Sequence, residues 1–406
     1  MQEPAKHPRR WTQFSLRTLL LLTLLIGVCT GLVGTRLLAA KRQQRIVEAV
    51  ESIGGSAWYY DYRDPPDLHI THEIQPGPQW LRGLLGDHFF KDVVRFHLGG
   101  GDLTTKLAHV KELPSIREVH FGHPNVRSVF TNEALSDIAS LTQVRRLDFS
   151  YSNINDAELY YVVGLPNLRS LWLDGCQITN EGLERISRLP NIEQLSIQDT
   201  KIDDQGLRHL ASMKRLRLLY LSSNSHNDVK GRVSHRGLTH LKELVQIRDL
   251  LLNSIPVRDD DLKNFQGMTH IERLRFNASA ITDTGLEHLK DLTQLRELNL
   301  DSSRITDRGL TNLQGMTHLR LLGLADTKMG DEGLQYLQVL KQLEWVDLSW
   351  TCVTPRGITK IQSLLPNCDF VQSNGPLTTR TVASDRVAQT YNPPRDPAAN
   401  LNPIMP

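Results

Sequence analysis

The first residues that could bind a metal ion are two histidines and a glutamate in a short segment. His69, His72 and Glu73 stand close together along the chain, and imidazole and carboxylate groups are the ligands that zinc prefers. They follow Pro65-Pro66 in a stretch of alternating polar residues, where solvent-facing side chains are the more ordinary explanation. The segment therefore predicts polar side chains on the protein surface and no metal site.

A run of three carboxylates, Asp259 to Asp261, offers oxygen ligands suited to calcium. Asp259, however, occupies a position that recurs at Asp283 and Asp307, each time at the expected start of a helix. A negative charge there is stabilised by the positive end of the helix dipole. We therefore interpret the run as structural.

Neither a phosphate-binding loop nor an activated nucleophile is evident. Gly99-Gly100-Gly101 lacks both the GxGxxG frame and the lysine of a P-loop, so it predicts a turn. No Ser, Cys or His stands in a nucleophile motif, and the four cysteines have neither CxxC nor histidine-paired spacing. The sequence predicts a protein that is not an enzyme and has no metal or cofactor.

Composition and charge restrict the class of protein further. The chain has 406 residues, 39% hydrophobic and 23% charged, which is enough apolar mass for a large core. The first 45 residues carry a net charge of +7 and the remainder −5. Nucleic-acid-binding domains need clustered positive charge, so we expect no nucleic-acid partner.

An apolar segment near the N-terminus predicts one transmembrane helix. Thr18 to Thr35 is uncharged and lies between Arg17 and Arg36; at about 1.5 Å per residue it nearly crosses a bilayer. We place the span at 18–38, after a basic tail at 1–17. A cleaved signal peptide and a twin-arginine signal are weaker alternatives, because the cleavage site and the flanking residues match poorly.

Basic residues are equally numerous on both sides of this span, so the positive-inside rule does not fix its orientation. We expect a signal anchor with the short tail inside and the large body exported. Gly27 and Gly31 form a GxxxG pattern that would let two such helices approach closely, and this predicts a homodimer contact within the membrane.

The body of the chain is a repeat. The pattern L-x-x-L-x-L recurs every 24 residues, with one interval of 31, from starts at Val144, Leu168, Ile192, Leu216, Ile247, Ile271, Leu295, Leu319 and Leu343. Two less regular units begin at Val93 and Ile116, and a stub follows at 368–371. Residues 93–371 thus hold about eleven repeats and a fragment, and each unit buries one strand and one helix against its neighbours.

One unit, LRELNLDSSRITDRGLTNLQGMTH at 295–318, shows both elements. Leu298 and Leu300 alternate as in a half-buried strand, and Leu310, Leu313 and Met316 recur at helical spacing. Strands pack about 4.8 Å apart and helices about 10 Å. The expected fold is an α/β solenoid, a curved horseshoe with a parallel β-sheet on its concave face and helices on its convex face.

The unit LxxLxLxxTxITDxGLxxLxxL resembles the leucine-rich repeat family, in its cysteine-containing or GALA-like subclass. Small hydroxyl residues largely replace the asparagine that closes each strand in that family. The segments FSLRTLLLL, AKRQQRIVEAVESIGG and GPQWLRGLLGDHFFKDVV are similar to membrane-anchored leucine-rich repeat proteins of planctomycete bacteria. The resemblance covers most of the chain; it implies the fold and is nearly silent on function.

Two segments flank the repeats. Residues 39–92 predict a juxtamembrane helix, ended by Gly54-Gly55, and an aromatic-rich cap that covers the open end of the first repeat. Residues 372–406 are polar, rich in Pro and Asn and without period, which predicts a disordered tail.

Binding residues are expected on the concave face, where the side chain between two strand leucines points away from the core. Large side chains there predict a recognition surface, and the candidates are Trp172, Tyr220, Leu251, Arg275 and Trp345. Seven extra residues within 222–237 form an insertion loop whose basic candidates are Lys230, Arg232, His235 and Arg236.

These features together predict a membrane-anchored, non-catalytic module that binds an unidentified protein partner through its concave face. Two other interpretations stay open. One is a cytoplasmic adaptor of the ubiquitin-ligase or signalling type, although no F-box-like helices precede the repeats. The other is a structural protein of the cell envelope.

Overall fold

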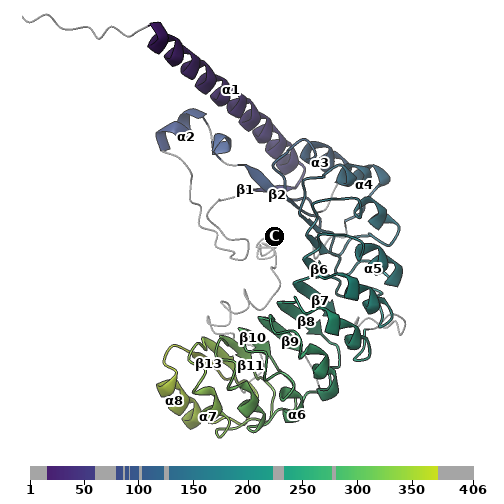
Figure 1. The fold of residues 1–406 in the computed structure, drawn as a ribbon, viewed down its shortest axis with the longest axis vertical. Helices are drawn as coiled ribbons and strands as arrows, with labels where there is room; N and C mark the ends of the chain where they lie inside the picture. Colours follow the sequence, from purple (N-terminus) through teal and green to yellow (C-terminus); the bar gives the residue numbers. More distant parts are fainter. Residues whose placement is uncertain are drawn as a thin grey trace, which may run out of the picture. The chain divides into compact units, whose positions relative to one another are not determined.

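The computed structural model describes residues 16–59, 79–85, 87–90, 92–99, 103–122, 128–222, 233–276 and 280–373. The chain divides into two compact units, Met1–Thr200 and Lys201–Pro406. In each unit the strands follow one another in the sheet in chain order, and the helices lie on the side away from the strands (Figure 1). Each unit is therefore a stack of strand–helix repeats.

The first unit begins with a long helix and a short antiparallel strand. Its elements are α1 (Leu16–Ser52), β1 (Ser56–Tyr59), α2 (Gln79–Leu85), η1 (Asp87–Phe89), β2 (Val93–His97), α3 (Leu103–Val110), β3 (Glu118–His120), α4 (Asn132–Ala139), β4 (Arg146–Asp148), η2 (Glu158–Tyr161), β5 (Ser170–Trp172), α5 (Asn180–Ile186) and β6 (Gln194–Ser196). β1 pairs antiparallel with β2, and β2 to β6 pair in parallel. The antiparallel β1 covers the edge of β2 that no repeat precedes.

The second unit contains only parallel strand pairs among its described residues. Its elements are η3 (Gly206–Ser212), β7 (Leu218–Ser222), η4 (Gly237–Glu243), β8 (Asp249–Asn253), η5 (Asp259–Phe265), β9 (Arg273–Phe276), α6 (Asp283–Leu286), β10 (Glu297–Asn299), η6 (Gly309–Leu313), β11 (Leu321–Gly323), α7 (Leu334–Leu337), β12 (Trp345–Asp347), α8 (Pro355–Leu364) and β13 (Asp369–Val371).

The expectation of an α-helix in every repeat is wrong for several of them. η2 to η6 are 3₁₀ segments of four to seven residues. The apolar spacing fits both helix types: Leu310, Leu313 and Met316 of the η6 repeat are three residues apart and buried, and so are Leu183, Ile186 and Leu189 of the α5 repeat. A 3₁₀-helix has three residues per turn, so this spacing places all three side chains on one face.

Small hydroxyl side chains close the strands, as the sequence indicated. The hydroxyl groups of Thr200, Thr327 and Thr351 donate to the carbonyl oxygens three residues earlier, at 2.9, 2.7 and 2.6 Å. Thr200 and Thr327 are buried, and Thr351 is partly buried. Each threonine therefore satisfies its own polar group within its repeat.

Adjacent repeats are joined by an aspartate at the start of each helix. The carboxylate of Asp283 accepts hydrogen bonds from the backbone N–H of Thr306 at 2.8 Å and from its hydroxyl at 2.6 Å. A Cβ at Gly309 would collide with this carboxylate. The same arrangement recurs at Asp156–Thr179–Gly182, Asp204–Ser234–Gly237, Asp259–Thr282–Gly285 and Asp331–Thr354–Gly357.

These aspartate joints extend the role expected from the sequence. The acidic residues stand at helix starts, as predicted, but each carboxylate also binds the next repeat. The recurring glycines leave room for it, which is the close approach that their missing side chains suggested.

α1 is one continuous helix with two different halves. Its residues from Leu20 to Val33 are all exposed, whereas Ala40, Gln43, Val47 and Val50 are buried on one face against the first repeats. α1 ends at Ser52, and Gly54, two residues later, has a φ of +81° that favours glycine. The exposed half of α1 is apolar and long enough to cross a membrane.

Candidate functional site

The strand faces carry the candidate site because their side chains alternate. From β2 to β12 each strand has a buried apolar residue in this register, Phe96 in β2 and a leucine or valine in the others, and its two neighbours project from the opposite face. The parallel register aligns these neighbours into columns. In the first unit one column reads Arg95, Glu118, Arg146, Ser170 and Gln194, and the next reads His97, His120, Asp148, Trp172 and Ser196.

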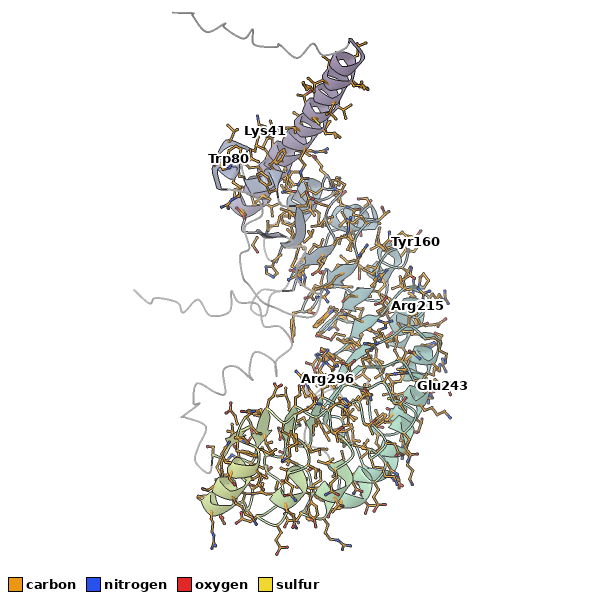
Figure 2. All side chains as sticks on the ribbon, turned by 60° about the vertical axis from the view of Figure 1, so that its left-hand side comes forward. Lys41, Trp80, Tyr160, Arg215, Glu243 and Arg296 are labelled. Atoms are coloured by element: carbon orange, nitrogen blue, oxygen red, sulfur yellow. The ribbon has the colours of Figure 1, made fainter. Side chains whose placement is uncertain are left out.

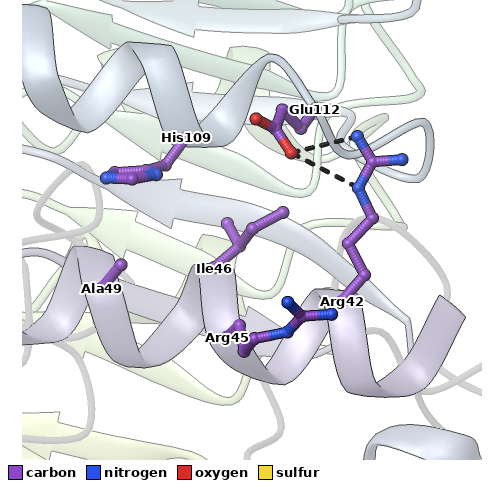
Figure 3. Close-up of a pocket in the computed structure, with 6 residues that line it drawn as sticks. All are labelled: Arg42, Arg45, Ile46, Ala49, His109 and Glu112. Atoms are coloured by element: carbon purple, nitrogen blue, oxygen red, sulfur yellow. Dashed lines mark hydrogen bonds and ion pairs between the residues drawn. The ribbon is translucent and has the colours of Figure 1, made fainter. Parts of the chain in front are cut away.

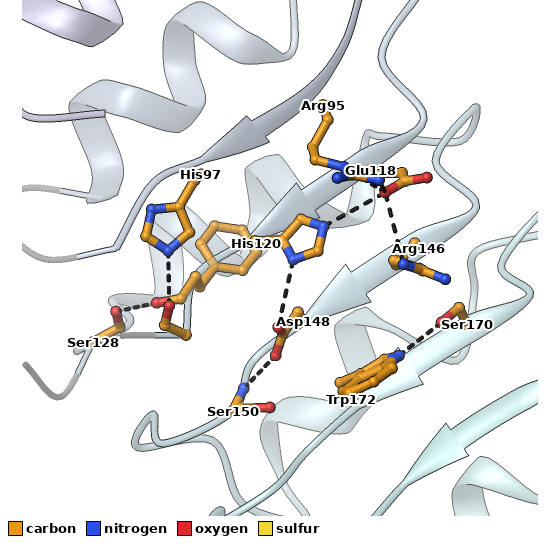
Figure 4. A network of polar contacts seen from close by, with 12 residues as sticks. Arg95, His97, Glu118, His120, Ser128, Arg146, Asp148, Ser150, Ser170 and Trp172 are labelled. Carbon is orange, nitrogen blue, oxygen red and sulfur yellow. Dashed lines mark hydrogen bonds and ion pairs between the residues drawn. The ribbon is translucent and has the colours of Figure 1, made fainter. Parts of the chain in front are cut away.

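The first unit concentrates charged side chains in these columns, and we call Arg95, Glu118, His120, Arg146 and Asp148 the Glu118 cluster (Figure 4). Arg95 Nε and Nη2 each lie 2.7 Å from Glu118 Oε2, and Arg146 Nη1 lies 3.9 Å from it. His120 Nε2 is 3.5 Å from the same oxygen, and His120 Nδ1 is 3.4 Å from Asp148 Oδ2. The five side chains are each 20% to 31% exposed.

The electrostatics keep every member of the Glu118 cluster charged. Burial alone would raise the pKa of Glu118, but His120, Arg146 and Arg95 lower it to about 2. Burial would likewise lower the pKa of His120, yet contacts with Asp148 and Glu118 raise it above its ordinary value. Burial opposes ionisation of Asp148 too, but its contact with His120 lowers the pKa of this carboxyl. The ion pairs thus favour the charged forms of Glu118, His120 and Asp148, and fixed charges of both signs are suited to recognising a complementary surface.

Asp174, in the loop after β5, is a buried carboxyl bound by neutral hydrogen-bond donors. It accepts hydrogen bonds from Ser196 Oγ at 2.5 Å and from the backbone N–H of Gln198 at 2.9 Å. Burial raises its pKa to about 7 despite these bonds. Asp174 therefore changes its charge near neutral pH.

In the second unit, side chains on the strand face bind one another and so become buried. Tyr220 donates its hydroxyl to Asp249 Oδ2 at 3.0 Å, and Arg273 Nε donates to the same oxygen at 2.7 Å. Arg275 forms a two-point ion pair with Glu297, at 2.5 and 2.9 Å. Burial opposes the charge of Arg275, but Glu297 raises its pKa further above the ordinary range.

The expected exposure of the concave candidates is therefore wrong for four of them. Tyr220 is 7% exposed, Leu251 3%, Arg275 6% and Trp345 7%. Long side chains on neighbouring strands contact one another and shield the face, as the Tyr220–Asp249 and Arg275–Glu297 pairs show. Replacing Tyr220 would accordingly disturb folding, contrary to the expectation from its outward direction.

Trp172 is the concave candidate that stays partly exposed. Its indole N–H donates to Ser170 Oγ at 2.9 Å, and its strand position is beside Asp148 of the Glu118 cluster. The binding roles of all five candidates remain predictions.

The two insertion-loop candidates that the structure describes, His235 and Arg236, do not join the strand face. His235 lies before η4 with its Nδ1 3.6 Å from Asp261 Oδ1, and the exposed Arg236 also precedes η4. Both therefore stand on the helix side of the repeat. Lys230 and Arg232 lie outside the described residues.

Sequence reasoning missed the column that holds Arg95, Glu118 and Arg146. The signal was available, because a strand places residues i and i+2 on the same face. It also missed a left-handed residue three positions after the strand in several repeats, such as Tyr151 at φ +60° and Trp350 at φ +60°. Both of these aromatic side chains are about half exposed.

The metal candidates have structural explanations or fall outside the described segments. Asp259 and Asp261 bind the backbone of Thr282 and Arg258, and Asp260 pairs with Lys263. His69, His72 and Glu73 lie outside the described residues. Within the described ranges no three His, Cys, Asp or Glu side chains gather closely enough to hold a metal ion.

A hollow of about 410 Å³ lies between α1 and the end of α3 (Figure 3). Arg42, Arg45, Ile46 and Ala49 line it from α1, and His109 and Glu112 line it from the first repeat. Arg42 Nη2 pairs with Glu112 Oε2 at 3.0 Å. The hollow marks the joint that holds α1 against the repeats.

Repeats of one strand and one short helix, with a polar network on the strand face, define a solenoid of the leucine-rich repeat type. A family model described as leucine rich repeat matches residues 164–187, 292–313 and 315–337. This supports the family that the sequence resembles. No curated protein matches the chain.

Three solved structures are similar to this chain at low identity. An internalin (InlF) from Listeria monocytogenes is 18% identical, with 73% of this chain and 94% of the internalin covered and a TM-score of 0.47. Internalin C2 from the same organism is 23% identical, with 54% and 84% covered and a TM-score of 0.41. TLR13, in a complex with ssRNA13, is 22% identical, with 63% and 35% covered and a TM-score of 0.42.

Proposed function

We propose that the chain is a membrane-anchored, non-catalytic module that binds a protein partner through the strand face of its first unit. Leucine-rich repeat proteins generally mediate protein–protein interaction, which is the coarse function that the fold supports. The observation that carries the finer proposal is the Glu118 cluster: five charged side chains, fixed by mutual ion pairs and still partly exposed. Charges held in place lose little conformational entropy when a complementary surface binds.

Trp172 adds an apolar anchor next to this cluster. Aromatic side chains at the centre of a polar surface dominate binding energy in many interfaces. The expected partner is a protein whose surface alternates acidic and basic groups, because the cluster itself alternates Arg95, Glu118 and Arg146 across three strands. The proposed site thus moves from the five original candidates to Trp172 and the Glu118 cluster.

Photo-crosslinking in native membranes tests this surface. Benzoylphenylalanine at position 172 should crosslink a discrete partner, whereas the same residue at Tyr160, on the exposed helix side, should not. Arg146→Ala in the chain labelled at 172 should reduce the adduct in a salt-dependent way. The matched control is Arg188→Ala, because Arg188 is an exposed arginine that pairs only within its own helix side, with Glu184 at 2.7 Å. Equal adducts from positions 172 and 160 would contradict the proposal.

For the anchor we propose that the exposed apolar half of α1 spans the membrane, with the repeats on the extracytoplasmic side. A reporter fused after Pro406 should then be active outside the cytoplasm, and protease added to intact spheroplasts should digest the repeats. Activity restricted to the cytoplasm would reverse the orientation and favour the adaptor interpretation. Pairing of two copies through Gly27 and Gly31, the cysteine-containing subclass and the likeness to planctomycete proteins remain parts of this proposal.

A further inference from the structure

The short helix α2 presents two large, exposed apolar side chains. Trp80 and Leu84 are 72% and 74% exposed and stand four residues apart, on one side of the helix. Figure 2 labels Trp80 on α2 and Lys41 on α1, and η1 contacts both helices. Two large apolar side chains projecting together from one helix indicate a surface that meets an apolar phase.

The segment that follows α2 is fixed to α1 at the end of the apolar stretch. Arg36 is the first charged residue after it, and its Nε donates to the carbonyl oxygen of Phe89 at 2.8 Å. Arg36 Nη1 also pairs with Asp92 at 2.7 Å. Seven residues later Gln43 accepts a hydrogen bond from the N–H of Val93 at 3.1 Å. These contacts hold the segment 89–93 along about 10 Å of α1, starting at the residue where charge begins.

The apolar surface also continues past Arg36 on α1 itself. Leu38 is 70% exposed, and Lys41 is the next charged residue along the helix. Ala40 and Gln43, in contrast, are buried against the body of the unit. If α1 spans the bilayer, the boundary between lipid and water therefore lies at the same height along α1 as η1 and the end of α2.

We propose that α2 lies in the interfacial layer of the membrane and inserts Trp80 and Leu84 among the lipid chains near the headgroups. Tryptophan is enriched at this depth because its ring is apolar and its N–H is polar. Amphipathic helices bind the same layer by burying one apolar face. The inference rests on the proposed anchoring by α1. It identifies lipid as the partner of the apolar face of α2.

Site-directed fluorescence on the full chain tests the assignment. The two exposed cysteines are first removed by Cys29→Ala and Cys352→Ser, because Cys176 and Cys368 are buried. An NBD label is then placed at Leu84→Cys or, as a control, at Tyr160→Cys, which is equally exposed on the helix side of the same unit. The labelled chains are reconstituted into phosphatidylcholine vesicles, and their thermal melts are compared with that of the unlabelled chain.

The label at position 84 should emit at shorter wavelength, be quenched by nitroxide lipids and be shielded from iodide. The label at position 160 should show the reverse. Iodide quenching of position 84 as strong as that of position 160 would overturn the inference.

Carbonate extraction of the same vesicles distinguishes a wrong inference about α2 from a wrong proposal that α1 spans the membrane. A chain that resists extraction while position 84 stays accessible to iodide keeps the anchor and loses the α2 contact. A chain that is extracted overturns both.

Discussion

Gly309→Ala and Asp283→Ala together test whether one carboxylate joins two repeats. Asp283 accepts two hydrogen bonds from Thr306, at 2.8 and 2.6 Å, and the site is partly buried. Hydrogen bonds to a charged group contribute about 1.5–3 kcal/mol each when buried. Allowing for partial exposure, we expect Asp283→Ala to lower the free energy of unfolding by about 2–3 kcal/mol.

Gly309→Ala should cost about the same, roughly 2–3 kcal/mol, for a different immediate reason. Its Cβ would collide with the Asp283 carboxylate and lie 3.1 Å from Ile305 Cγ2. The carboxylate must move, and its bonds to Thr306 are then lost. Once Asp283 is alanine, that collision is gone, so the double variant should be no less stable than Asp283→Ala alone.

Urea unfolding of the detergent-solubilised chain, followed by circular dichroism, measures this cycle. The matched control is Gly315→Ala, whose Cβ would make only an ordinary contact of 3.6 Å with the Lys290 carbonyl oxygen. Independent sites add to within about 0.5 kcal/mol. Additive losses from Gly309→Ala and Asp283→Ala would refute the idea that the glycine exists to make room for the carboxylate.

Three further expectations concern buried groups. Leu298→Asp should cost about 4 kcal/mol or more, because Leu298 is fully buried; a wild-type urea midpoint would show that the strand register is wrong. Glu297→Gln should cost about 3 kcal/mol, since it removes the carboxylate charge that pairs with the buried Arg275, and a change below about 1 kcal/mol would contradict this. The raised pKa of Asp174, about 7, favours the folded chain below pH 4, and this stabilisation is lost as the pH rises through 7. In wild type this group should lower the free energy of unfolding by about 1.4 kcal/mol for each pH unit between pH 4 and 7. Asp174→Asn should therefore make the free energy of unfolding less dependent on pH in this range. An unchanged pH profile would exclude the effect.

The repeat could be predicted because its signal is local and repeated. A period of 24 residues with leucines at fixed positions determines which side of each strand is buried, and Leu298 and Leu300 are fully buried as expected. The convex helices were predicted less well. Leucines three residues apart fit both an α-helix and a 3₁₀-helix, and the choice depends on how closely the neighbouring repeats approach.

The candidate site shows where sequence reasoning stops. Alternation places Tyr220 and Arg275 on the strand face, but it does not tell which residue from a neighbouring strand covers them. Arg275 and Glu297 are 22 residues apart, and their pairing follows from the register of β9 and β10. The Glu118 cluster depends on the same cross-strand geometry, so single-strand patterns could indicate its members but not their contacts.

If α1 spans the membrane as proposed, its continuity connects the first unit rigidly to the bilayer. Residues 16–52 form one helix without proline, and its last third is packed into the body of the unit at Gln43, Val47 and Val50. Kinks in helices need a proline, a bulge or an inserted group, and a straight helix of this length extends about 55 Å. If its first half lies in lipid, a tilt or rotation of that half also rotates the first unit, because the two are parts of one rigid helix. Bilayer thickness would then set the angle at which the Glu118 cluster faces a partner.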